Sequence, residues 1–265
     1  MQQKSILLTL VGCFMLVSHA AIALDSKPDG EWRGLGSLSY TNTSGNNRTS
    51  ALNLTFDAAR QTAQDKITFY AQALQSSSTT DDANGQSVTT KTSDLWRVGS
   101  RYDYNISTSI FAFGGLDLER DPIKSLDQRT AVNAGLGYHW IKSDATTLDV
   151  FGGFNQRHDK YKAPGVEIEN MLRESYTSTE VLLGEEFSQK INDSVSLKQR
   201  YVAYPNLKTS GKFRSVLDIG LSVAINKAMS LTVGFQHRYD SLAAEPLKKG
   251  DTLFMTGISV SLGGN

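Results

Sequence analysis

The sequence predicts an all-β fold: a single antiparallel transmembrane β-barrel of about twelve strands. Three observations support this prediction: alternating apolar and polar residues in many segments, connections that alternate in length, and an N-terminal secretion signal. Residues 213–240 show the alternation most clearly. Every second position there is apolar or aromatic, with one histidine, on both sides of a polar break at 226–228: Leu217, Ile219, Leu221, Val223 and Ile225, then Leu231, Val233, Phe235, His237 and Tyr239. A period of two is that of a β-strand, and a tight turn joins two such strands into a hairpin.

The remaining strands repeat this pattern in order along the chain. They are predicted at residues 32–40, 52–59, 67–73, 94–104, 109–118, 129–140, 148–157, 177–187, 195–203 and 254–262. The segment 109–118 is the least regular, because Phe111 and Phe113 oppose Ile110, Ala112 and Leu116, which favours burial of both faces. Most of these segments are long enough to cross the hydrocarbon layer of a bilayer, which takes about 9 to 11 residues for a tilted strand.

The connections between these strands form two classes. Short turns are predicted at residues 44–47, 105–107, 142–144, 192–193 and 226–228, with a break near 63–64. Longer polar loops are predicted at 76–90, 119–127, 158–173, 205–211 and 241–250. With the N-terminus in the periplasm, the long connections face outward and the short ones inward, as in bacterial outer-membrane barrels. The first connection, at 44–47, is an exception because it is short.

Composition excludes a helical membrane protein. Hydrophobic residues make up 39% of the chain and the mean hydropathy is −0.30, and no apolar run after the N-terminus approaches the roughly 20 residues of a spanning helix. Alternation alone leaves open a soluble sandwich or a lipocalin-like barrel with its apolar face inward. Long strands, charges on one face, alternating connection lengths and a secretion signal together favour the membrane barrel.

Residues 1–23 are predicted to be a cleaved signal peptide, which leaves 24–265 as the outer-membrane β-barrel domain. Lys4 provides the positive region, residues 6–17 the apolar core, and Ala21-Ile22-Ala23 the cleavage site. Lipidation of Cys13 is an alternative, with a very short apolar core before it. Cleavage after Ala23 leaves no cysteine and 26 basic against 27 acidic residues, so a nucleic-acid partner is not expected.

Aromatic residues on the predicted lipid-facing side gather near the strand ends. Such residues form the two interfacial girdles of membrane barrels. The girdle at the periplasmic ends is predicted to contain Trp32, Tyr102, Tyr104, Tyr138, Trp140 and Phe187, and the girdle at the outer ends Tyr40, Trp96, Phe154, Tyr176 and Phe254.

Charged residues recur on the opposite face, which is predicted to line the lumen. They are Arg33, Asp57, Arg97, Arg101, Asp103, Asp117, Arg129, Asp149, Arg157, Glu180, Glu186, Lys198, Arg200, Asp218 and Arg238. Both signs occur, so these side chains can pair across a narrow lumen and fill it. A barrel of this size has little free bore unless its interior side chains are small. The alternative is a selective narrow pore.

Evidence for catalysis or metal binding is weak. His139, His158 and His237 lack a metal-ligand partner at helical or hairpin spacing. A hydrolase that uses His139 or His237 with a nearby serine is a second alternative, but the chain is rich in serine and the pattern has little specificity. The pairs Gly114-Gly115 and Gly152-Gly153 lie inside strands, so they fit bends or close packing in the wall better than a phosphate loop.

Several motifs in the middle of the chain match those of a known family: Arg101-Tyr102-Asp103-Tyr104-Asn105, Phe111-Ala112-Phe113-Gly114, Leu118-Glu119-Arg120-Asp121, Gln128-Arg129 and Gly135-Leu136-Gly137-Tyr138. With Trp32-Arg33-Gly34 and Ser44-Gly45-Asn46, they resemble the YdiY-like salt-induced outer-membrane β-barrel proteins, a family with a domain of unknown function. The resemblance covers most of the mature chain. It implies an outer-membrane location and a stress-related role, without a defined activity.

The predicted function is therefore that of an integral outer-membrane protein of the cell envelope with a narrow or side-chain-filled lumen and no catalysis. A narrow solute or ion channel is the first alternative. The expected partners are outer-membrane lipid and lipopolysaccharide, and the barrel-assembly machinery during biogenesis. No cofactor is expected, and the protein is predicted to be a monomer.

Overall fold

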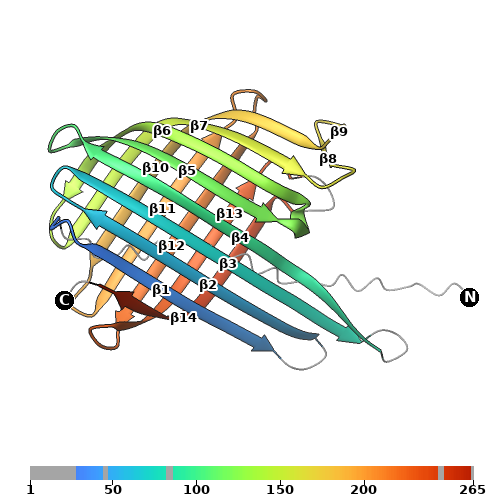
Figure 1. The fold of residues 1–265 in the computed structure, drawn as a ribbon, viewed down its shortest axis with the longest axis horizontal. Helices are drawn as coiled ribbons and strands as arrows, with labels where there is room; N and C mark the ends of the chain where they lie inside the picture. Colours follow the sequence, from blue (N-terminus) through green and yellow to red (C-terminus); the bar gives the residue numbers. More distant parts are fainter. Residues whose placement is uncertain (1–27, 44–46, 82–85, 244–247, 264–265) are drawn as a thin grey trace, which may run out of the picture.

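The computed structural model describes residues 28–43, 47–81, 86–243 and 248–263. In this part of the chain, twelve strands close into one antiparallel barrel, so the predicted fold class is confirmed (Figure 1). The barrel strands are β1 (Trp32–Thr43), β2 (Asn47–Gln61), β3 (Asp65–Asp81), β4 (Ser87–Asn105), β5 (Ile110–Asp121), β6 (Leu126–Lys142), β7 (Thr146–Tyr161), β10 (Ser175–Lys190), β11 (Val195–Pro205), β12 (Phe213–Ala224), β13 (Met229–Asp240) and β14 (Gly250–Leu262). The predicted signal peptide, residues 1–23, lies outside the described residues.

Each barrel strand pairs with its neighbours in sequence, and β1 pairs with β14 to complete the ring. At this junction residues 34–38 pair with 258–262, and the Ser37 and Ser259 hydroxyls lie 2.6 Å apart. Closure matters because the backbone N–H and C=O groups of an open edge would have no partner in a lipid environment.

The connections separate the barrel into two ends. At the turn end, where β1 begins and β14 finishes, the strands are joined by residues 62–64, 106–109, 143–145, 191–194 and 225–228. At the loop end lie the longer segments 162–174 and 206–212, and residues 241–243 and 248–249 between β13 and β14. Segment 162–174 contains a small two-stranded sheet, β8 (Val166–Ile168) and β9 (Met171–Arg173), and the short 3-10 helix η1 (Pro122–Lys124) joins β5 to β6. The predicted turn at 44–47 falls mostly outside the described residues.

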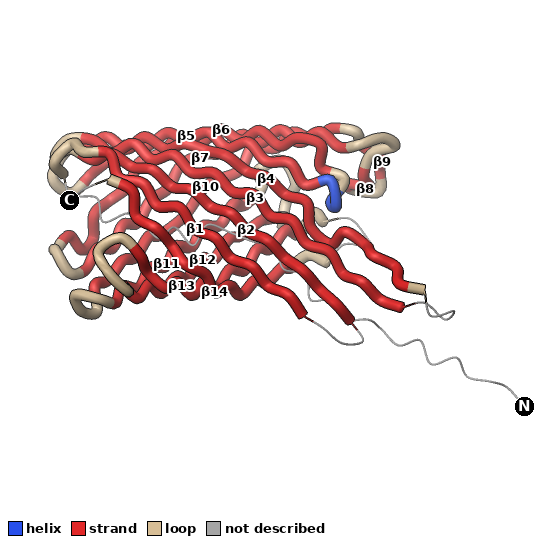
Figure 2. The backbone as a smooth tube through the Cα atoms, turned by 60° about the horizontal axis from the view of Figure 1, so that its bottom comes forward, coloured by secondary structure: helices blue, strands red, loops and turns tan. Residues whose placement is uncertain are grey.

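The prediction of a polar loop at residues 76–90 is wrong. β3 and β4 continue through it and pair up to Asp81 and Ser87, so both strands project farther at the loop end than most others (Figures 1 and 2). The Ser- and Thr-rich sequence carries no apolar alternation, but strand pairing there depends on backbone hydrogen bonds, assisted by contacts such as Thr79 Oγ1 to Thr89 Oγ1 at 2.8 Å. The loops predicted at 119–127 and 158–173 are likewise shorter, because β5 runs to Asp121 and β7 to Tyr161.

The outer surface of the barrel is apolar at mid-height. Outward side chains that are at least 40% exposed include Leu38, Leu54, Phe56, Val132, Leu136, Leu183 and Ile258. Among the described residues, no helix has the length and hydropathy needed to cross a membrane. An apolar belt around a closed sheet, with charges inside, is the arrangement of a transmembrane barrel.

The aromatic girdles are largely as predicted. Trp32, Tyr102, Tyr104, Tyr138, Trp140, Tyr40, Trp96, Phe154 and Phe254 are all exposed. The prediction for Tyr176 is wrong, since it is only 2% exposed. Its side chain shares a face of β10 with Ser178 and Glu180, which point inward because side chains of a strand alternate between the two faces. The expectation that both faces of 109–118 are buried is wrong, because Phe111 and Phe113 point inward whereas Ile110 and Leu116 point outward and are each 42% exposed.

The side chains of neighbouring residues on β12 point to opposite faces of the barrel wall, and this orientation can be tested. Leu221→Arg places a charge in the apolar belt and is expected to destabilise the barrel by about 2 to 4 kcal/mol near the membrane midplane. Ser222→Arg places the same charge on the inner face and is expected to cost far less. Unfolding by urea in lipid vesicles measures both, and equal losses for the two variants would contradict the assigned orientation.

Candidate functional site

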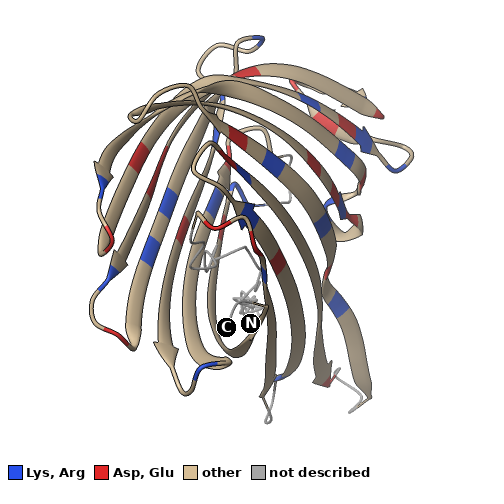
Figure 3. Ribbon diagram, turned by 60° about the vertical axis from the view of Figure 1, so that its left-hand side comes forward, with Lys and Arg blue, Asp and Glu red and all other residues tan. Residues whose placement is uncertain are grey.

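The interior of the barrel is the candidate site. The predicted lumen residues Arg33, Asp57, Arg97, Arg101, Asp103, Arg129, Asp149, Glu180, Lys198, Arg200, Asp218 and Arg238 all lie on barrel strands with their side chains on the inner face. Charged residues of both signs recur along the strands (Figure 3). The three other charged residues predicted to line the lumen, Asp117, Arg157 and Glu186, lie inside as well.

The two largest cavities described in the lumen form the candidate site. The larger, of about 240 Å³, lies toward the turn end and is called here the turn-end chamber; it is lined by residues that include Lys66, Arg101, Asp149, Phe151 and Lys198. The smaller, of about 150 Å³, lies toward the loop end and is called the loop-end chamber; its lining includes Lys124, Arg129, Arg157, Arg214 and Arg238.

An ion-pair network crosses the turn-end chamber. Arg101 on β4 donates to Asp103 at 2.8 Å and reaches Glu186 on β10 at 3.0 Å. Arg200 on β11 donates to the same Glu186 oxygen at 2.9 Å. Asp218 accepts a hydrogen bond from Gln236 on the neighbouring strand. One carboxylate thus joins arginines from two parts of the wall.

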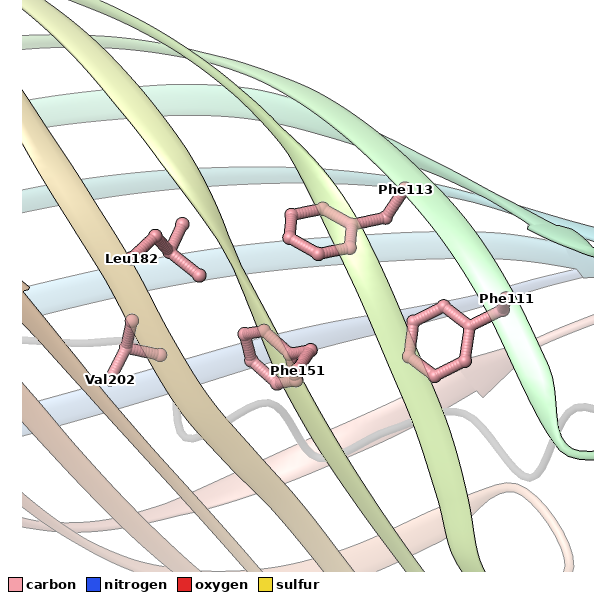
Figure 4. Close-up of a cluster of buried hydrophobic side chains, with 5 residues drawn as sticks. All are labelled: Phe111, Phe113, Phe151, Leu182 and Val202. Carbon is pink, nitrogen blue, oxygen red and sulfur yellow. The ribbon is translucent and has the colours of Figure 1, made fainter.

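A buried apolar cluster lies beside this network. It consists of Phe111, Phe113, Phe151, Leu182 and Val202, each at most 7% exposed (Figure 4). The Arg101 guanidinium carbon lies 4.7 Å from the Phe113 ring centre and 4.8 Å from that of Phe151, within the range of cation–π attraction. This cluster was not predicted from the sequence, although the irregular pattern of residues 109–118 was a signal for it.

Glycines make room for the rings of this cluster. A Cβ atom at Gly137 would collide with the Phe111 ring, and a Cβ at Gly184 would collide with that of Phe151. At Gly135 and Gly153 the backbones of β6 and β7 approach so closely that a Cβ on either would strike the other strand. The prediction that Gly153 serves close packing in the wall is therefore confirmed.

The two chambers share part of their side-chain lining. Arg97, Asp117, Arg200 and Tyr204 line both cavities. Arg97 donates to Asp117 at 2.6 Å, and its guanidinium carbon lies 5.3 Å from the centre of the Tyr70 ring. We call these four residues the constriction.

The loop-end chamber is organised by arginines held against buried acids. Arg129 donates to both carboxylate oxygens of Asp159, at 2.7 and 2.8 Å, and Arg214 donates to both oxygens of Glu180, at 3.0 and 2.7 Å. Glu119 accepts from Arg129 at 3.4 Å. Arg214 was not among the predicted lumen residues, although it shares the parity of Asp218, and Glu119 and Asp159 were predicted to lie in loops.

At the turn end, Arg33 pairs with Asp29 just before β1. Its guanidinium donates to both carboxylate oxygens, and these hydrogen bonds hold the pKa of the Asp29 carboxyl well below its usual range. Asp57 and Lys198 line the turn-end chamber on opposite walls, from β2 and β11.

The described hydrogen-bond partners of the three histidines include no serine. His139 Nδ1 lies 2.7 Å from Asp149 and its Nε2 lies 3.2 Å from the Asn105 side chain, so both ring nitrogens have partners other than serine. His158 and His237 each contact a threonine hydroxyl, Thr177 and Thr252, on the exposed outer surface. In the described segments no group of three His, Cys, Asp or Glu residues is arranged to hold a metal ion.

Comparison with known families gives one clear match. The family described as "Protein of unknown function, DUF481" matches residues 36–262, which is most of the chain. The chain belongs to this family. It is the YdiY-like family of the sequence resemblance, which is thereby confirmed. Membership of the DUF481 family defines no activity.

Solved structures resemble the barrel of this DUF481 protein more distantly. The translocator domain of autotransporter NalP from Neisseria meningitidis is 14% identical, with 91% of each chain covered and a TM-score of 0.47. The KdgM porin is 10% identical, with 87% of this chain and 99% of that one covered and a TM-score of 0.45. No curated protein matches the chain. At these identities and TM-scores, the similarities do not bear on function.

Adjacent glutamates on β10 allow a test of the lumen network. Glu185 points outward beside Leu183, where it accepts a hydrogen bond from Gln199 at 2.8 Å, whereas Glu186 joins Arg101 and Arg200 inside. Glu186→Leu leaves two arginines without their shared carboxylate and is expected to destabilise the barrel by roughly 2 kcal/mol. Glu185→Leu is expected to be neutral or stabilising, since it removes a carboxyl from the apolar belt. The temperature at which each variant changes its gel mobility on heating compares their stabilities. A larger loss of stability for Glu185→Leu than for Glu186→Leu would contradict the assignment of Glu186 to the lumen.

The ring pocket at Gly137 gives a second test. Gly137→Ala inserts a methyl group where the Phe111 ring lies, so we expect a loss of roughly 1 to 3 kcal/mol from overpacking. Gly36→Ala is the matched control, because nothing lies within 4 Å of a Cβ at that position. Unfolding free energies of both variants measure the difference, and equal stability would show that the ring moves aside freely.

Proposed function

We propose that this protein is an outer-membrane channel whose narrow lumen passes small hydrophilic solutes. The observation that carries the proposal is the division of the lumen into two chambers that share the constriction residues Arg97, Asp117, Arg200 and Tyr204. Side chains of the barrel wall separate the chambers, and side chains change rotamer far faster than a backbone rearranges. A rotation of Arg97 away from Asp117 would connect the two spaces.

The direction of the channel follows from the connections. Short turns in bacterial barrels face the periplasm and longer loops face outward. The loop-end chamber would therefore receive solute from outside, and the turn-end chamber would release it into the periplasm. Outer-membrane lipid would cover the apolar belt. Contacts with lipopolysaccharide and with the barrel-assembly machinery, a monomeric state and a stress-related role belong to this proposal as predictions.

A closed barrel that serves only as an envelope component is the main alternative, since ion pairs could hold the constriction shut. A hydrolase has less support, because the described contacts of His139 and His237 include no serine.

Single-channel recording in planar bilayers separates channel from closed barrel. The purified protein is expected to give small, discrete conductance steps. The double variant Arg97→Ala/Asp117→Ala removes the ion pair of the constriction and is expected to raise the step size by about two-fold or more, because a narrow point dominates the resistance of a pore.

The control is Arg48→Ala, which removes an exposed arginine that pairs with Asp81 at the loop end, away from both chambers. Its steps are expected to match those of the unchanged protein. If neither the unchanged protein nor the double variant gives steps, the channel proposal is wrong and the barrel is closed.

A further inference from the structure

The loop-end chamber presents more positive than negative side chains. Nine basic residues line it: Arg97, Lys124, Arg129, Arg157, Arg200, Arg214, Arg238, Lys248 and Lys249. Four acidic residues do so: Asp117, Glu119, Asp240 and Asp251. Asp159 and Glu180, which pair with some of the arginines, are fully buried and do not line the cavity. The arginine heads therefore lie between these two acids and the cavity.

Two of the central arginines make paired hydrogen bonds to a carboxylate and two do not. Arg129 and Arg214 each make a two-pronged pair, with Asp159 and Glu180. In Arg157 and Arg238, by contrast, the Nε atoms are buried and have no hydrogen-bond partner within the described part of the chain, and the same holds for Nη1 of Arg157.

Arg157 is the most unusual of these residues, since it is only 1% exposed. Its nearest carboxylate oxygens, on Asp159, Glu180 and Asp240, lie 3.6, 3.7 and 3.6 Å away, beyond ordinary hydrogen-bond distance. Both acids inside the wall are already committed to Arg129 and Arg214. Arg157 therefore lies in the wall of the chamber with two N–H-bearing nitrogens that have no hydrogen-bond acceptor among the described residues, and leaving buried charged donors unbonded is unfavourable.

Arg238 has a similar environment on the facing strand β13. Its nearest carboxylate oxygen, on Glu119, lies 3.6 Å away, and that carboxylate is shared with Arg129. A planar guanidinium with free N–H groups fits the oxygens of a carboxylate or phosphate, which accept two parallel hydrogen bonds.

We propose that the loop-end chamber is a binding site for a small oxyanion, a carboxylate or phosphate group, held by Arg157 and Arg238. The volume of about 150 Å³ is well above the roughly 10 to 15 Å³ that one water needs, so an oxyanion and several waters fit together. The selectivity that follows rests on the proposed channel function: solute passing the chamber is preferentially anionic. Binding itself requires only access from the loop end.

Binding is measured as the rise in thermal unfolding midpoint of the detergent-solubilised protein when sodium phosphate replaces sodium chloride at equal ionic strength. A ligand that binds only the folded state raises this midpoint. Sodium acetate in a parallel series distinguishes carboxylate from phosphate. We expect a rise with phosphate, acetate or both.

Arg238→Gln is the first variant, because its side chain is 17% exposed and its loss leaves Glu119 paired with Arg129. It is expected to lose at least half of the rise. Arg157→Gln is expected to abolish the rise, and if it does not fold, Arg238→Gln decides alone. Arg48→Gln removes one loop-end charge outside the chamber and is expected to keep the full rise. No rise over chloride, or an equal rise in Arg238→Gln and Arg48→Gln, overturns the site.

Reversal potentials in a potassium chloride gradient test the selectivity. The unchanged protein is expected to prefer chloride, and Arg238→Gln to reduce that preference. Conductance without an anion-dependent rise in unfolding midpoint would refute the oxyanion site and leave the channel. An anion-dependent rise in unfolding midpoint without any conductance would support the oxyanion site and refute the channel proposal.

Discussion

The structure depends on the requirement that every backbone polar group in a lipid environment finds its partner within the protein. Twelve antiparallel strands approach this requirement by closing into a ring, in which residues 34–38 of β1 pair with residues 258–262 of β14. Once the ring is closed, each strand has one face toward the lipid and one toward the lumen. The apolar residues of every second position then lie outside, and the charged residues between them share one narrow interior.

That interior determines what the barrel can do. Arginines and carboxylates from distant strands meet there, as in the bridge from Arg101 on β4 to Glu186 on β10. Buried ion pairs add little net stability compared with apolar packing, because both partners lose water on burial. The aromatic cluster around Phe113 and Phe151 supplies apolar packing on one side of the lumen. In the proposed channel, the charged side chains of the ion pairs would exchange partners with water and solute in the two chambers.

Much of this fold could be predicted from the sequence because alternation is a local signal. The period of two placed all twelve barrel strands and assigned Arg97, Arg101 and Glu186 to the inner face. The alternation did not predict strands whose sequence has no apolar face. The Ser- and Thr-rich ends of β3 and β4 have no apolar face, so the pairing of Asp81 with Ser87 left no trace in hydropathy.

The partners of the interior charges could not be predicted. They depend on the register between strands and on the curvature of the closed sheet, which bring Arg157 near Asp240 although 83 positions separate them in the chain. Tyr176 shows the same limit on a smaller scale: its position near a strand end suggested the lipid interface, but its side chain lies inside, where the Arg157 guanidinium carbon is 5.9 Å from its ring centre.

The central claim is that the apolar face of this barrel meets lipid, and the three tryptophans report on it directly. Trp32 and Trp140 lie near the turn end and Trp96 toward the loop end, all with exposed outward rings. Tryptophan fluorescence of the protein in vesicles of brominated lipids measures their contact with acyl chains. The structure predicts strong quenching by bromine near the interfaces and weak quenching by aqueous iodide. Strong iodide quenching with none by brominated lipid would show that these faces lie in water and would contradict the inside-out arrangement.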